Sequence, residues 1–179
     1  MESSPLSEHA DKTEIIELIN LYAFALDAHR WDLFDRIFTE DVLADYGPGA
    51  VWRSRTDFVN VFVAIHEAHD SHQHTMMGHL VHVDADTAYA FTYGNWLLIR
   101  YAAEGGPTWL GTGWYDDELV RTDRGWRINH RISRIVSYSG NSNIPGLPQP
   151  VEGEAPEQVQ KMSEQVGKIR YFNAMVANP

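Results

Sequence analysis

The chain has 179 residues, of which 44% are apolar or aromatic, and it carries a formal net charge of −11. This length predicts one domain with enough apolar surface to bury a core without metal ions or disulfides. The negative charge repels phosphate backbones and anionic lipids, so we expect neither nucleic acid nor membrane surfaces as partners.

The chain contains no cysteine, which excludes disulfides, thiolate nucleophiles and cysteine-based zinc sites, and suits a reducing compartment. Its first stretch, MESSPLSEHADKTE, is polar and acidic and lacks the features of a signal peptide. No apolar run approaches the roughly 20 residues needed to cross a bilayer. We therefore expect a soluble, cytoplasmic protein.

The N-terminal part of the sequence predicts three helices. The first, over residues 11–29, places apolar side chains at helical spacing, namely Ile15, Leu18, Ile19, Tyr22 and Leu26. A short second helix is expected over 31–38, followed by a strand that ends at Tyr46 and a loop. A third helix should run from about Ser54 to His69.

The middle of the chain predicts an antiparallel meander of long strands over residues 72–83, 87–103, 108–122 and 126–138. The segments between them contain Asp and Gly, which suit tight turns. Because helices come first and strands follow, the expected fold class is α+β with a curved sheet. Small residues on one face of the second strand leave room inside the sheet or permit close helix packing.

After Asn141 the composition shifts to a stretch rich in Pro, Gly and Glu, which predicts an extended linker. The shift divides the chain into a domain over residues 1–140 and a tail over 141–179. Residues 156–176 recover a helical apolar stripe, so we expect the tail to dock on its own subunit or on a neighbouring one.

Three sequence stretches together resemble one known family. They are LINLYAFALDAHRWDLF, which contains Tyr22 and Asp27, SHQHTMMGHLVHVDADTA, which contains His74, and GWRINHRISR, which contains Arg131. Over roughly residues 11–140 the chain resembles the scytalone dehydratase and SnoaL-like branch of the nuclear transport factor 2-like superfamily. The resemblance implies a cone-shaped α+β fold in which three N-terminal helices pack on a mainly antiparallel sheet around an internal pocket.

The resemblance also implies a catalytic pair. His74 takes the position of the family's catalytic histidine, and Asp27 that of the aspartate that hydrogen-bonds it. Imidazole titrates near neutrality and can both take up and return a proton. A neighbouring carboxylate would fix its tautomer and stabilise the imidazolium. The alternative for Asp27 is a cap at the end of the helix.

Three further side chains are implied as binders of substrate oxygen. Tyr22 resembles a tyrosine of the bile acid dehydratase branch, Tyr46 a tyrosine of scytalone dehydratase, and Arg131 a pocket arginine of dehydratase and dehydrohalogenase relatives. The alternatives are core packing for Tyr22 and a solvated ion pair for Arg131. Because Arg131 and Arg134 are three residues apart on a strand, only one should face inside.

His72, Trp96 and Tyr115 are further candidates for substrate binding. Trp96 and Tyr115, together with Trp109 and Trp114, could form flat walls for a hydroaromatic, aryl or steroid-like ligand. Ordinary sheet packing is the alternative for each of these aromatic residues. The match to scytalone dehydratase is incomplete near Tyr115, because that enzyme's asparagine falls there and its second histidine falls near Leu98. Scytalone is therefore not the expected substrate.

The pair His72 and His74 also raises the question of a metal site, since alternate residues of a strand face the same side. His79, His82 or Asp27 would have to complete the ligand set. Odd-numbered and even-numbered positions face opposite ways unless a bulge intervenes, and the family that the chain resembles works without metal. We therefore expect neither a metal ion nor a cofactor.

These observations predict a cofactor-independent lyase that acts on a hydrophobic aromatic, hydroaromatic or steroid-like small molecule. Dehydration next to a carbonyl and retro-aldol cleavage, such as loss of formaldehyde, use the same base and the same oxygen-binding groups. The alternatives are an isomerase or cyclase of the same fold, and a non-catalytic module for ligand binding or assembly. Because an open apolar sheet face needs covering and relatives form dimers or trimers, we expect a homodimer or homotrimer.

Overall fold

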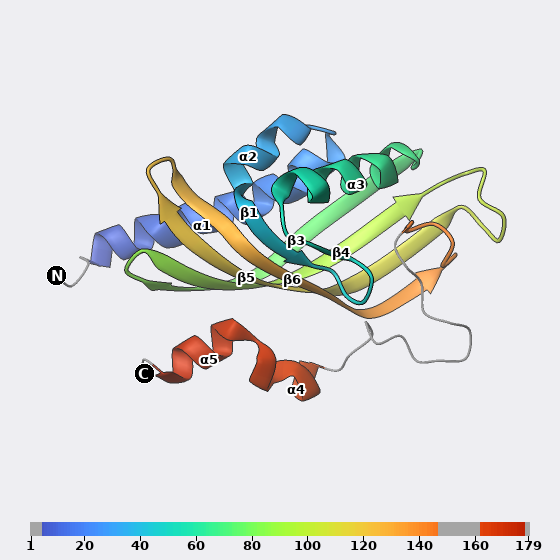
Figure 1. The fold of residues 1–179 in the computed structure, drawn as a ribbon. Helices are drawn as coiled ribbons and strands as arrows, with labels where there is room; N and C mark the ends of the chain where they lie inside the picture. The colour runs from blue at the N-terminus through green and yellow to red at the C-terminus, as the bar shows by residue number, and fades with distance from the viewer. Residues whose placement is uncertain (1–4, 147–161, 178–179) are drawn as a thin grey trace.

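The computed structural model describes residues 5–146 and 162–177 (Figure 1). Six strands form one curved sheet in the order β2-β1-β6-β5-β4-β3. The expected antiparallel meander is present as β3 (Ser71–Asp84), β4 (Thr87–Ile99), β5 (Thr108–Thr122) and β6 (Gly125–Gly140). The α+β fold class is therefore confirmed. The expected second strand of this meander ends at Ile99 rather than at residue 103, because Arg100 N already donates to Pro107 O and closes the hairpin.

A short N-terminal pair of strands extends the sheet beyond the meander. β1 (Phe38–Asp45) pairs with β6 in parallel, and β2 (Val51–Trp52) pairs with β1 in antiparallel orientation. β1 begins at Phe38, within the region expected to be helical, where a 3-10 turn (Trp31–Leu33) and the single turn of α2 (Phe34–Ile37) replace one longer helix.

Three helices cover one face of the sheet: α1 (Pro5–Asp27), α2 and α3 (Arg55–Glu67) (Figure 1). α1 buries its predicted stripe completely at Ile15, Ile19 and Leu26. It ends two residues earlier than expected, because His29 adopts a left-handed backbone conformation with a φ of 51°. None of the helices in the described ranges combines the length and the apolar character that crossing a bilayer requires.

The tail lies on the opposite face of the sheet (Figure 1). It consists of α4 (Met162–Gln165), a 3-10 turn (Val166–Lys168) and α5 (Arg170–Ala177), and residues 156–161 of the expected helix lie outside the described residues. Ile169 and Tyr171 are buried there against Phe91 and Trp114 of the sheet. The tail thus docks on its own chain, on the side away from the three N-terminal helices.

A buried ion pair joins the two central strands. Arg131 of β6 donates to both carboxylate oxygens of Asp117 on β5 at 2.7 Å, and both side chains are fully buried. The guanidinium carbon also lies 4.2 Å from the ring centre of Tyr22 and 4.5 Å from that of Tyr115. Taking two charges out of water is costly, and here the bidentate geometry and the aromatic rings offset that cost.

We expect Asp117→Asn to lower the free energy of unfolding by about 3–5 kcal/mol, because it leaves the buried charge of Arg131 without a counter-charge. Chemical denaturation followed by circular dichroism measures this loss. Asp32→Asn is the matched control, because Asp32 forms an exposed ion pair with Arg30 and its loss should leave the midpoint unchanged. Equal midpoints for wild type and Asp117→Asn would contradict the structural importance of the buried pair.

Candidate active site

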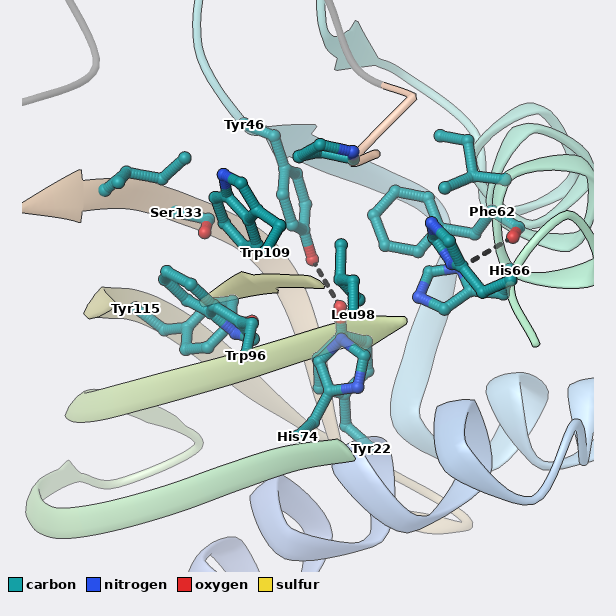
Figure 2. A pocket seen from close by; sticks show the side chains of 14 residues that line it. Tyr22, Tyr46, Phe62, His66, His74, Trp96, Leu98, Trp109, Tyr115 and Ser133 are labelled. Atoms are coloured by element: carbon teal, nitrogen blue, oxygen red, sulfur yellow. Dashed lines mark hydrogen bonds between the residues drawn. The ribbon is translucent and has the colours of Figure 1, made fainter. Parts of the chain in front are cut away.

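A cavity lies between the helices and the curved sheet (Figure 2). The volume open to the centres of water molecules is about 80 Å³, which is room for several waters or a small ring, since one water needs on the order of 10–15 Å³ by this measure. Its wall is mainly aromatic, with Tyr22, Tyr46, Phe62, Trp96, Trp109 and Tyr115. Among the described residues that line it, none is Asp, Glu, Lys or Arg.

His74 and Asp27 meet beside this cavity, as the resemblance implied. Asp27, the last residue of α1, places Oδ1 2.7 Å from Nδ1 of His74. Its two carboxylate oxygens also accept hydrogen bonds from the main-chain N–H of His74, at 3.1 and 2.9 Å. One carboxylate therefore holds both the backbone and the ring of His74. This contact makes the helix cap reading of Asp27 wrong, whereas the catalytic role of the pair stays a prediction.

The hydrogen bond determines which nitrogen of His74 is available. A carboxylate can only accept, so Nδ1 carries the hydrogen and Nε2 of the neutral ring keeps its lone pair. Burial lowers the pKa of His74, while the hydrogen bond and the charge of Asp27 raise it, and the net direction is downward. The ring is therefore neutral near pH 7 and able to act as a base in the cavity.

Tyr22 and Tyr46 form a second polar group in the cavity wall. Their hydroxyl oxygens lie 2.8 Å apart, and both residues are buried (Figure 2). Burial raises the pKa of each tyrosine, so both hydroxyls stay protonated near neutrality. Because one hydroxyl donates to the other, the second hydroxyl keeps a hydrogen that can bind an oxygen atom in the cavity.

Arg131 lies behind the cavity wall and is not among the residues that line it. The rings of Tyr22 and Tyr115 cover its guanidinium group, and Asp117 neutralises it. The expectation that Arg131 faces the pocket is thus corrected, and the alternative of a solvated ion pair is wrong as well because the pair is fully buried. Arg134, the other candidate arginine of this strand, faces the opposite side and binds Asp45 at 2.9 Å.

His72 also lies outside the cavity lining. Its Nε2 lies 3.1 Å from the carbonyl oxygen of Leu26, and its ring stacks on that of His29 with 5.1 Å between centres. His72 therefore braces the end of α1 beside the His74 pair. Within the described ranges, no group of three or more His, Asp or Glu side chains is arranged to hold a metal ion.

Trp96 and Tyr115 both line the cavity, as expected, and the indole N–H of Trp96 donates to the hydroxyl of Tyr115 at 2.7 Å. Trp109 lines it too. Trp114 does not, because the alternation of β5 turns it to the opposite sheet face, where it packs against the tail. The expected aromatic wall is therefore present without Trp114.

Three polar residues of the cavity were not predicted: His66, His69 and Ser133. For His66 a signal was present, because it follows Phe58 and Phe62 at helical spacing on the buried face of α3. Ser133 follows Arg131 by two residues and so shares its strand face. His69 lies in the turn after α3, where no periodicity indicates direction.

Comparison with known proteins places most of this chain in a family. The profile of the SnoaL-like domain matches residues 7–132. An uncharacterised protein of Mycobacterium tuberculosis is 30% identical over 128 residues, which cover 71% of this chain and 86% of that protein.

Two solved structures of low sequence identity share the fold. A protein from Novosphingobium aromaticivorans, described as a candidate scytalone dehydratase, has a TM-score of 0.67 at 20% identity and covers 84% of this chain and 96% of its own. A hexachlorocyclohexane dehydrochlorinase from Novosphingobium barchaimii has a TM-score of 0.68 at 17% identity and covers 82% of this chain and 100% of its own.

We expect the pKa of His74 to lie below 6.5 when its ring is titrated by nuclear magnetic resonance. Asp27→Asn should lower this pKa further, because it removes the negative charge that favours the imidazolium. An unchanged or raised pKa of His74 in Asp27→Asn would show that the carboxylate does not support the charged ring.

We also expect the protein to lose stability as the pH falls below about 6.5. Burial lowers the pKa of His66 to about 2. In this acid range His66 therefore binds a proton in the unfolded chain but stays unprotonated in the folded chain. The free energy of unfolding then falls with decreasing pH, by roughly 1 kcal/mol per pH unit for one such group. Denaturation curves measured at several values between pH 7 and pH 4 give this dependence. The free energy of unfolding should change less with pH for His66→Phe than for the wild type. An equal pH dependence would contradict the low pKa.

Proposed function

The chain belongs to the SnoaL-like domain family, and from this membership we propose that it is a lyase in which His74, rather than a cofactor, carries the proton. The single observation that supports this most is the 2.7 Å contact between Asp27 and Nδ1 of His74 at the wall of a cavity. It orients a neutral base toward the cavity. A module that only bound ligands would not need this half-buried pair.

In the favoured reaction the substrate is a β-hydroxy carbonyl compound. Nε2 of His74 removes a hydrogen from the carbon next to the carbonyl, and Asp27 stabilises the imidazolium that forms. The hydroxyl pair of Tyr22 and Tyr46 donates a hydrogen bond to the carbonyl oxygen as it gains negative charge. The imidazolium then protonates the departing hydroxyl group. Water leaves, a carbon–carbon double bond forms, and the enzyme returns to its starting state.

A retro-aldol cleavage would use the same groups in a different order. His74 would take the proton of the β-hydroxyl group, the bond between the α and β carbons would break, and an aldehyde would leave. The resulting enolate, held by Tyr22 and Tyr46, would take the proton back from His74 on carbon. Both reactions conserve the protons of the pair, so neither needs an oxidant or a reductant.

The character of the wall supports a hydrophobic, ring-bearing substrate. Flat aromatic side chains line most of the cavity and match flat ligands, and the wall carries no formal charge among the described residues. Arg131 takes no direct part in this proposal, because Asp117 neutralises its charge beneath Tyr22 and Tyr115. The names of the two structural neighbours, a candidate dehydratase and a dehydrochlorinase, are consistent with an elimination reaction.

The proposal is tested by incubating the protein with a panel of β-hydroxy carbonyl compounds on aromatic, hydroaromatic and steroid frameworks, followed by mass measurement of the products. We expect loss of water for dehydration or loss of formaldehyde for retro-aldol cleavage. His74→Ala should lower kcat by about 10²–10⁴-fold, the usual contribution of a general base. Asp27→Asn should lower kcat as well, because the imidazolium loses its counter-charge.

His9→Ala is the control for these assays, because His9 is exposed and lies outside the cavity lining. Its turnover should equal that of the wild type. Equal turnover by His74→Ala would remove His74 from the mechanism and overturn the proposal.

A further inference from the structure

A second imidazole faces the same cavity as His74. His66 projects from the last turn of α3, is 4% exposed, and lines the cavity (Figure 2). The centres of the His66 and His74 rings lie 5.5 Å apart. The mechanism above does not use His66, although a small substrate held against His74 would lie close to it.

The position of the hydrogen on His66 follows from its contacts. Nδ1 lies 2.7 Å from the carbonyl oxygen of Phe62, one helical turn earlier, and a carbonyl can only accept, so Nδ1 carries the hydrogen. Burial keeps the ring neutral by lowering its pKa to about 2. Nε2 therefore presents a lone pair and no hydrogen. Within the described residues, no side chain or main-chain group donates to it.

The contact with Phe62 explains the orientation of His66 but leaves its second nitrogen unused. Because His66 lines the cavity, a group bound there can donate a hydrogen bond to this nitrogen. A phenylalanine or leucine at this point of the apolar stripe of α3 would lack this acceptor. The imidazole is thus better explained by what it offers to the cavity than by the packing of the helix.

The cavity presents donors and acceptors at separate points. The tyrosine pair Tyr22 and Tyr46 offers a hydrogen, and so does the buried indole N–H of Trp109. Nε2 of His66 and His74 and Nδ1 of His69 offer lone pairs. Because no charged side chain among the described residues lines the cavity, an ionic ligand would be desolvated there without a counter-charge. The complementary ligand is therefore uncharged, with at least one oxygen acceptor and at least one hydroxyl donor on a ring.

We propose that His66 determines specificity by accepting a hydrogen bond from a hydroxyl group of an uncharged, ring-bearing carbonyl compound whose carbonyl oxygen binds the tyrosine pair. This inference deepens the proposed function and rests on it for the identity of the reacting carbon. It adds that a ligand without the hydroxyl group binds more weakly, because it leaves Nε2 of His66 unpaired. His74 then faces the part of the ring between the two bound oxygens.

His69 is the other residue that could accept this hydroxyl. Its Nε2 donates to the carbonyl oxygen of Ile144 at 2.9 Å, and its buried Nδ1 has no hydrogen-bond partner among the described residues. It lies at the end of the cavity formed by the turn after α3, and its ring centre is 5.9 Å from that of His66. The experiment must therefore separate His66 from His69.

The test compares the binding of 4-hydroxyacetophenone and acetophenone, which share the ring and the carbonyl and differ in one hydroxyl group. Calorimetric titration at pH 7 should show about tenfold tighter binding of the hydroxylated probe to the wild type, a difference of about 1.4 kcal/mol. His66→Phe keeps an aromatic ring and removes the acceptor, so the ratio of the two dissociation constants should fall to about one. His69→Phe and the exposed control His9→Phe should keep the wild-type ratio.

A measurement on the wild type keeps the proposal falsifiable if His66→Phe does not fold. The nitrogen resonance of His66 Nε2 should move when 4-hydroxyacetophenone binds and stay in place with acetophenone. An unmoved resonance would overturn the proposal. So would a ratio near one for the wild type, binding of neither probe, or loss of the ratio in His69→Phe alone.

These binding experiments need no turnover, so they are independent of the lyase assay. A wild-type preference for the hydroxylated probe that depends on His66, combined with no product from any carbonyl compound, would sink the proposed reaction and leave the specificity of the cavity standing. Turnover that depends on His74 but is unchanged in His66→Phe would support the proposed reaction and contradict the role of His66 in specificity.

Discussion

The site depends on the contact between the end of α1 and the start of β3. Asp27 binds the ring of His74 and the main-chain N–H of the same residue, so the strand and the side chain are held together by one carboxylate. The helix that carries Asp27 is itself fixed by its buried apolar stripe. The imidazole is consequently oriented before any ligand enters, which is the condition under which a base contributes most to a proton transfer.

Burial sorts the polar groups of the interior into neutral and charged layers. At the cavity wall it lowers the pKa of His66 and His74 and raises that of Tyr22 and Tyr46, so these groups are uncharged near neutrality. Full charges occur behind this wall, where Asp27 contacts His74 and Asp117 compensates Arg131. A substrate therefore meets hydrogen-bonding groups of defined direction, while the buried ion pair lies behind the aromatic rings that cover it.

Much of this arrangement could be predicted where the information is local. Helical spacing located α1 and α3, alternation located the meander, and the resemblance brought Asp27 and His74 together although they are far apart in the sequence. The burial of Arg131 could not be predicted, because it depends on Asp117 of a neighbouring strand and on rings from α1 and β5. His66 was overlooked because a histidine in an apolar helical stripe is usually a packing residue, and only the cavity reveals its free nitrogen.

Consecutive residues of β5 face two different layers of the protein. Tyr115 and Asp117 face the cavity side, whereas Trp114 and Asp116 face the tail, where Asp116 accepts a hydrogen bond from Arg170 at 3.0 Å. Because neighbouring strand residues point to opposite faces, inserting or deleting a single residue here would exchange the two sets. Substitutions in this strand can evolve one at a time, but its length cannot change without disturbing the ligand cavity and the anchor of the C-terminal helix in the same step.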